Sequence, residues 1–197
     1  PYLRCITPSA SAKGPMDDLP YQGGALRFDW ALSWPSLLSD SGVEMPGTVK
    51  WWDLLEHRPL MTADEVLFGR PLALYKRFLE HPRMDDHWRR LQLTEADYAG
   101  IDVPSLSFSG WFDGTLSGTL AHYQGMREHS LAGDQHFLIV GPWEHMTAPD
   151  GGYSYLTGEP VSRVGDLELP ERAFLPGKEI TRQFFDWCAR GEGEFAS

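Results

Sequence analysis

Two short apolar segments that end in the same way constrain the fold of this chain most. Residues 103–110 (VPSLSFSG) are followed by WFDG, and residues 136–141 (HFLIVG) are followed by PWEH. Between them, residues 119–129 repeat with a helical period. Strands that are nearly continuous in apolar and small residues are typical of parallel sheets covered on both faces. The segment therefore predicts a βαβ unit and an α/β fold.

The residues that follow these two segments suit catalysis. Asp113 comes just after the first predicted strand, and His145 comes just after the second. In open α/β sheets, ligands and catalytic groups gather beyond the carboxyl ends of the strands. An Asp followed by a His is also the second half of the Ser, Asp, His order of α/β hydrolases. Taken singly, the two residues are more often turn, cap or surface residues. Together, they predict a carboxylate that orients an imidazole base.

The rest of the chain is read mainly as helices. From Tyr21 to about Gly100, apolar residues recur at helical spacing. Thr62 to Glu65 fits a capping box, and the helix it opens would break near Pro71. A last helix over 179–190 would end at Gly191, and a β-prone run, YLRCIT, opens the chain before Pro8.

Charge and cysteine content exclude several classes of protein. The net charge of −11 over 197 residues argues against nucleic acid as a partner, because such proteins carry basic stripes. The apolar runs are too short to span a bilayer, so no membrane partner is expected. The two cysteines, Cys5 and Cys188, lie nearly the whole chain apart, and we expect two isolated buried thiols. The cytoplasm is then the default compartment.

Five stretches carry a resemblance that covers nearly the whole chain. They are YQGGALRFDWALSW, HPRMDDHW, IDVPSLSFSGWFDG, LIVGPWEHM and RQFFDWCARGEGE. In this order they resemble the CocE/NonD family of serine hydrolases, the peptidase S15-like group of X-Pro dipeptidyl-peptidases, cocaine esterase and α-amino-acid ester hydrolases. The resemblance implies that Asp113 and His145 are triad members and that no cofactor is needed. It also implies hydrolase-domain segments at 1–20 and 101–197, with a helical cap at 21–100 inserted between them.

The sequence departs from that family in three features, two of which are catalytic. The family's GxSYxG nucleophile motif is not present, nor is its oxyanion-hole Tyr, and the C-terminal jelly roll is missing as well. Ser154 in GGYSYLTG lies one residue out of register and after the His, so we interpret it as part of a polar loop. We therefore expect a fragment that is inactive alone. Its partners would be an ester, amide or short peptide substrate, and either a second copy or the missing N-terminal half. The alternative is a non-catalytic α/β binding or assembly module.

A few other residues are candidates for the functional site, and each also has a purely structural explanation. Trp111, Phe112 and Trp143 flank the predicted pair and would line an acyl pocket, although aromatic residues at strand ends are core residues about as often. Asp85 and Asp86 match the family's DDxW, yet helix capping explains them more simply. The other histidines have no HExxH or comparable spacing, so no metal site is expected.

Overall fold

The structure is a computed structural model that describes residues 2–38 and 44–195. These residues form two compact units: unit 1 combines Pro1–Lys13 with Leu93–Ser197, and unit 2 is Gly14–Gln92. The domain boundaries expected from the sequence, after residues 20 and 100, stay a prediction. Residues 39–43 of the expected cap lie outside the described part of the chain.

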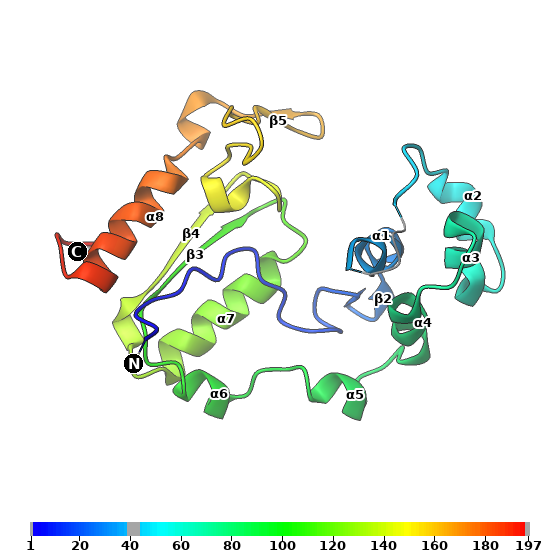
Figure 1. The fold of residues 1–197 in the computed structure, drawn as a ribbon, viewed down its shortest axis with the longest axis horizontal. Helices are drawn as coiled ribbons and strands as arrows, with labels where there is room; N and C mark the ends of the chain where they lie inside the picture. The colour runs from blue at the N-terminus through cyan, green and yellow to red at the C-terminus, as the bar shows by residue number, and fades with distance from the viewer. Residues whose placement is uncertain (1, 39–43, 196–197) are drawn as a thin grey trace. The chain divides into compact units, whose positions relative to one another are not determined.

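Unit 1 is built around two parallel strands. β3 (Ser105–Gly110) pairs with β4 (His136–Gly141) so that Ser105 lies opposite His136 and Gly110 lies opposite Gly141. α7 (Leu116–His129) connects them, and Figure 1 shows it alongside the strand pair. The predicted βαβ unit is therefore confirmed, with α7 beginning three residues earlier than the sequence pattern indicated.

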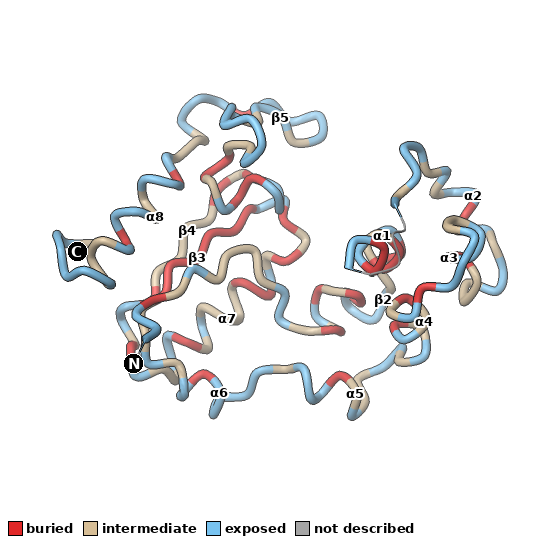
Figure 2. The backbone as a smooth tube through the Cα atoms, viewed as in Figure 1, coloured by how far each residue is buried: buried red, intermediate tan, exposed pale blue. Residues whose placement is uncertain are grey.

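The two faces of β3 meet different helices. On one face, the Ser105 hydroxyl lies 3.8 Å from the Met126 sulfur of α7. On the other face, Leu106 and Phe108 belong to a core cluster that includes Phe184 of α8 (Gly177–Phe185). Every residue of β3 is buried as a result, as Figure 2 shows.

The remaining elements of unit 1 are short. They are α6 (Glu95–Ala99), η2 (Gly133–Gln135), η3 (Ala148–Asp150), β5 (Arg163–Val164), β6 (Leu167–Glu168), η4 (Glu171–Ala173) and η5 (Asp186–Arg190). η5 is a π-helical turn that continues α8, and it ends at Gly191 with a φ of 73°. The predicted helix end at this glycine is thus confirmed. Over the described residues, no helix has the length and apolar character needed to cross a bilayer.

Unit 2 is mainly helical. A small antiparallel pair, β1 (Tyr21–Gln22) and β2 (Ala25–Leu26), is followed by α1 (Phe28–Leu38), α2 (Trp51–Glu56), η1 (Leu60–Thr62), α3 (Ala63–Phe68), α4 (Ala73–Glu80) and α5 (Asp86–Arg89). The fully buried Leu32 and Tyr75 and the nearly buried Trp88 anchor its core. The break predicted near Pro71 separates α3 from α4, and among the described residues β1 and β2 pair only with each other.

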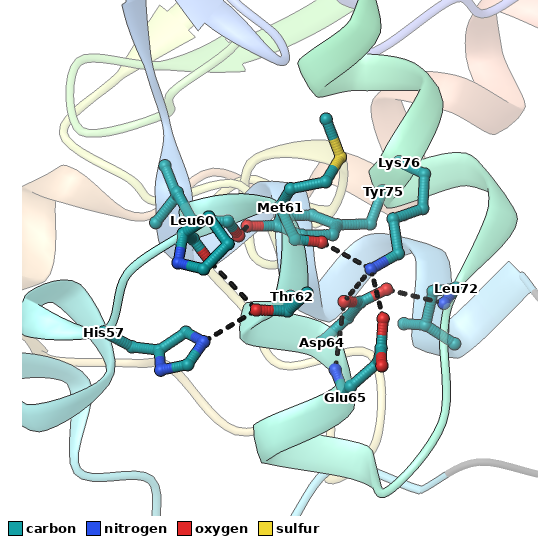
Figure 3. Close-up of polar contacts among 10 residues, drawn as sticks. His57, Leu60, Met61, Thr62, Asp64, Glu65, Leu72, Tyr75 and Lys76 are labelled. Atoms are coloured by element: carbon teal, nitrogen blue, oxygen red, sulfur yellow. Dashed lines mark hydrogen bonds and ion pairs between the residues drawn. The ribbon is translucent and has the colours of Figure 1, made fainter.

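A buried carboxylate joins α3 to α4 (Figure 3). The Asp64 side chain has no exposed surface and accepts hydrogen bonds from the Leu72 amide at 2.7 Å and from Lys76 Nζ at 2.8 Å. Lys76 also reaches a Glu65 carboxylate oxygen at 2.7 Å and the Met61 carbonyl. Buried charges persist only when they are paired in this way. The network therefore holds the loop between the two helices.

The capping box expected at Thr62 is wrong. Thr62 precedes α3 but makes no side-chain capping bond. Its hydroxyl instead donates to the Pro59 carbonyl at 3.0 Å and lies 2.8 Å from His57 Nε2, because a 3₁₀ turn runs into the helix. A capping box that we did not expect occurs where Thr94 and Asp97 open α6.

The cysteines are also placed differently from expectation. Cys5 and Cys188 form a disulfide with a Cα–Cα separation of 6.3 Å, so the two isolated thiols are a wrong prediction. The segment that carries Cys5 runs beside β3, to which Ile6 is bridged at Ser105, and both cysteines lie in the core cluster of Phe184. The fold thus brings together residues 183 positions apart. The expected opening strand is reduced to that single bridge.

Candidate active site

The loops that follow β3 and β4 are hydrogen-bonded to one another. The Trp111 amide donates to the Gly141 carbonyl at 2.9 Å, and the Phe112 amide donates to the Trp143 carbonyl at 3.1 Å. Because the strands are parallel and in register, both loops leave the same edge of the sheet. Residues at corresponding positions after the two strands are therefore brought together.

Asp113 and His145 meet at this edge. His145 Nδ1 lies 2.9 Å from Asp113 Oδ1, within the range of a hydrogen bond. The Asp113 side chain has no exposed surface, whereas 46% of the His145 side chain is exposed. One ring nitrogen of His145 therefore faces a buried carboxylate oxygen, while other parts of the ring are open to solvent. The contact predicted from the strand ends is present, and the catalytic roles of the two residues remain predictions.

The pair shifts the pKa of both of its members. Burial acts to raise the pKa of the Asp113 carboxyl, but hydrogen bonds from His145 and Thr115 outweigh it and bring this pKa below the ordinary value. The hydrogen bond to Asp113 raises the pKa of His145 above its ordinary 6.5, against an opposing effect of burial. The arrangement therefore favours an ionised carboxylate beside an imidazole that binds protons readily.

These shifts predict a pH-dependent contribution to stability. A raised pKa in the folded state means that His145 stabilises the fold fully below pH 6.5, and that this stabilisation is lost as the pH rises through the folded-state pKa. For Asp113 the sign is reversed. Its stabilisation is fully present above pH 3.8, the ordinary pKa of the group, and it is lost as the pH falls through the lowered pKa of the folded state. His145→Ala should therefore lower the free energy of unfolding more at pH 5 than at pH 9, as measured by denaturant unfolding. In an Asp113→Asn background this difference should disappear, and its persistence there would contradict the assignment.

Trp143 fixes the loop that carries His145. Its side chain is 1% exposed, and its indole N–H donates to the Ala173 carbonyl at 2.8 Å. Three glycines leave room for it, since a Cβ at Gly110 would lie 2.0 Å from the Trp143 carbonyl oxygen, and a Cβ at Gly141 or Gly152 would lie 2.5 Å from its ring. Trp143 is therefore a core residue, which is the alternative left open by the sequence.

The other aromatic candidates lie at the surface. Trp111 is 63% exposed and Phe112 is 48% exposed. Their backbone amides hold the loop, and their side chains remain free to contact an apolar substrate. A substrate-binding role for Trp111 and Phe112 remains a prediction.

The remaining candidates have structural roles. The Ser154 hydroxyl accepts hydrogen bonds from the amides of Leu156 and Thr157 at 3.3 Å, as expected for a turn in a polar loop. Asp85 caps α5 by accepting from two backbone amides, which confirms the capping interpretation, and Asp86 pairs with Arg89 at 2.7 Å. No group of three His, Cys, Asp or Glu side chains within residues 2–38 and 44–195 is placed to hold a metal ion.

Sequence reasoning missed the residues that surround the Asp113 carboxylate. Thr115 and Ser109 both donate to it. The position of Thr115 at the start of a helix was a weak signal. The alternation of Ser105, Ser107 and Ser109 along a buried strand was another, because buried hydroxyls need partners.

Comparisons with known proteins agree on one family. A family model described as X-Pro dipeptidyl-peptidase (S15 family) matches residues 1–147, a range that contains both Asp113 and His145. The chain is also 27% identical, over 210 aligned residues, to a cocaine esterase from Rhodococcus sp. (strain MB1 Bresler). That alignment covers 96% of this chain and 33% of the relative, so the chain spans about one third of the relative's length.

Proposed function

Because this chain belongs to the X-Pro dipeptidyl-peptidase (S15) family, we propose that it contributes the Asp and the His of a Ser-His-Asp triad to a serine hydrolase of acyl esters or amides. The nucleophilic serine lies outside this sequence. The observation that carries the proposal is the 2.9 Å contact between Asp113 and His145 at the carboxyl edge of two parallel strands. In this proposal unit 1 is the C-terminal part of an α/β-hydrolase fold, and residues 21–100 are its helical cap.

The chemistry follows from the orientation of the imidazole. With Nδ1 bonded to Asp113, His145 has Nε2 available to take the proton of a serine hydroxyl as its oxygen attacks the substrate carbonyl carbon. The same nitrogen then returns the proton to the leaving alcohol or amine, which leaves an acyl-enzyme. Water then attacks the acyl carbon with His145 again acting as base, and His145 returns the proton to the serine oxygen as the bond between this oxygen and the acyl carbon breaks and the acid leaves. Asp113 stabilises the imidazolium at each stage, and burial strengthens that interaction.

The substrate class follows from the family and from the surroundings of the pair. Trp111 and Phe112 expose apolar surface within two residues of Asp113, which supports binding of an apolar acyl or aromatic group. Esters, amides and short peptides, including peptides that begin with X-Pro, are the proposed substrates. A second copy of the chain, or a segment that carries the family's nucleophile, is the proposed protein partner.

Hydrolysis of p-nitrophenyl acetate tests the proposal. The 197-residue chain alone should react no faster than its His145→Ala variant, because this proposal places the nucleophile and the oxyanion hole outside the given sequence. A polypeptide that joins this chain to the family's nucleophile segment should be active and should lose several orders of magnitude in kcat on the same substitution.

Two results would contradict the proposal. Turnover by the isolated chain that Ser154→Ala abolishes would make the polar loop the nucleophile. A joined polypeptide that folds but shows no dependence on His145 would favour the alternative of a non-catalytic module.

A further inference from the structure

Three donors converge on one oxygen of the Asp113 carboxylate. Asp113 Oδ1 accepts from the Thr115 amide at 2.8 Å, from the Thr115 hydroxyl at 2.8 Å and from His145 Nδ1 at 2.9 Å. The other oxygen, Oδ2, has a longer contact of 3.4 Å with the Ser109 hydroxyl. Thr115 is itself buried, with 3% of its surface exposed. The carboxylate that faces the imidazole is therefore held mainly by one residue that neither the family resemblance nor the comparisons assign.

Thr115 is in turn fixed by the first turn of α7. Its carbonyl accepts from the Thr119 amide at 3.0 Å, and the Asp113 carbonyl accepts from the Leu116 amide at 3.2 Å. The backbone amide and the hydroxyl of Thr115, which lies directly before α7, thus both donate to the same oxygen of the Asp113 carboxylate. Two donors fixed on a single oxygen restrict rotation of the carboxylate about its Cβ–Cγ bond.

The direction of the hydroxyl proton also selects a tautomer of the imidazole. An ionised carboxylate only accepts, so the Thr115 hydroxyl must donate its single proton to Asp113. The Thr115 oxygen, which lies 3.5 Å from His145 Nδ1, then presents lone pairs to that nitrogen. Both groups beside Nδ1 are acceptors, and a protonated Nδ1 is therefore favoured. In neutral imidazole this leaves Nε2 with the lone pair that a general base needs.

We propose that Thr115 is a positioning residue: it locks the Asp113 carboxylate toward His145 and, through it, holds the imidazole in the tautomer with a proton on Nδ1. The catalytic meaning of this role rests on the proposed function. The positioning itself does not, because it concerns groups that are all present in this chain. It acts on the orientation of Asp113 and not on the substrate.

Nitrogen-15 NMR of the histidine rings in the 197-residue chain tests the proposal directly. In the unsubstituted chain, neutral His145 should be the tautomer with the proton on Nδ1. Thr115→Val keeps the shape and the backbone amide but removes the hydroxyl. It should lower the pKa of His145 toward the ordinary value and increase the fraction of the other tautomer, because the carboxylate is free to turn away. Thr115→Ser restores the donor and should return both readouts toward those of the unsubstituted chain.

Ser109→Ala is the matched control, since it removes the longer contact from the opposite oxygen and should shift both readouts less than Thr115→Val.

A change confined to the stability of the fold would leave the tautomer ratio unmoved and would overturn the proposal. A rise in the pKa of His145 in Thr115→Val would also overturn it, because the hydroxyl would then be competing with the imidazole. If Thr115→Val does not fold, the unsubstituted chain still decides the matter, since a predominant Nε2-protonated tautomer there would overturn the proposal too. Loss of esterase activity in the joined polypeptide has no bearing on these readouts, so the two proposals fail separately.

Discussion

Replacing Asp113 with asparagine should lower the kcat of ester hydrolysis by about 10⁴-fold in a polypeptide that joins this chain to the family's nucleophile segment. Asparagine has nearly the same shape, but its amide cannot stabilise an imidazolium through a negative charge. Its NH₂ group can also donate to Nδ1, which would favour the tautomer that blocks Nε2. The 2.9 Å contact with His145 and the complete burial of the carboxylate are the reasons to expect a large effect at this position.

The measurement is kcat for p-nitrophenyl acetate, with protein folding checked by circular dichroism. Asp134→Asn serves as the control, because its side chain is 97% exposed and its ion pair is with Arg127. That variant should keep the full rate. An Asp113→Asn enzyme with more than about a tenth of the original kcat would show that the carboxylate is structural and not catalytic.

Loss of the disulfide should have the largest effect on stability. Cys188→Ser should lower the free energy of unfolding by about 2 to 5 kcal/mol, because a cross-link between residues far apart in sequence restricts the unfolded chain. The bond ties the segment before Pro8 to the turn that ends α8, and the two cysteines are 183 positions apart. Denaturant unfolding of the oxidised chain and its variant gives the difference.

The double variant Cys5→Ser, Cys188→Ser separates the cross-link from side-chain effects. It should be about as stable as the single variant, and a thiol reductant should destabilise the original chain but not the double variant. Two thiols that react with a thiol reagent before any reduction would contradict the bond.

Reducing compartments such as the cytoplasm disfavour disulfides, so this bond does not support the default assignment to the cytoplasm.

Local patterns predicted the fold best where the signal lies within a few consecutive residues. The continuous apolar character of 136–141 and the small and apolar residues of 103–110 suited strands buried on both faces, and the register of β3 and β4 then placed Asp113 beside His145. Gly191 predicted a helix end because few other residues adopt its φ of 73°. In each case the signal lay within a few residues.

The failures have more than one physical cause. Whether Cys5 and Cys188 meet is decided by how the first and last segments pack on the face of β3, and spacing alone does not carry that information. The hydroxyl of Thr62 had two local uses, and a 3₁₀ turn gave it the Pro59 carbonyl in place of the helix amide. The hydrogen bond from the Thr115 hydroxyl to Asp113 depends on the rotamer of the carboxylate, and no sequence pattern predicts that rotamer.

The close packing around Trp143 also restricts the order in which substitutions can accumulate. A methyl group at Gly141 would collide first with the indole ring, so a smaller residue at 143 would make that change acceptable afterwards. At Gly152 the ring is again the nearest obstacle, but a φ of 96° adds a backbone penalty that no change at 143 removes. At Gly110 the collision is with the main-chain carbonyl of residue 143, which every amino acid carries. A side chain at position 141 therefore becomes possible once residue 143 has been replaced by a smaller one. At position 110, any side chain would still collide with the main chain as long as this backbone is kept.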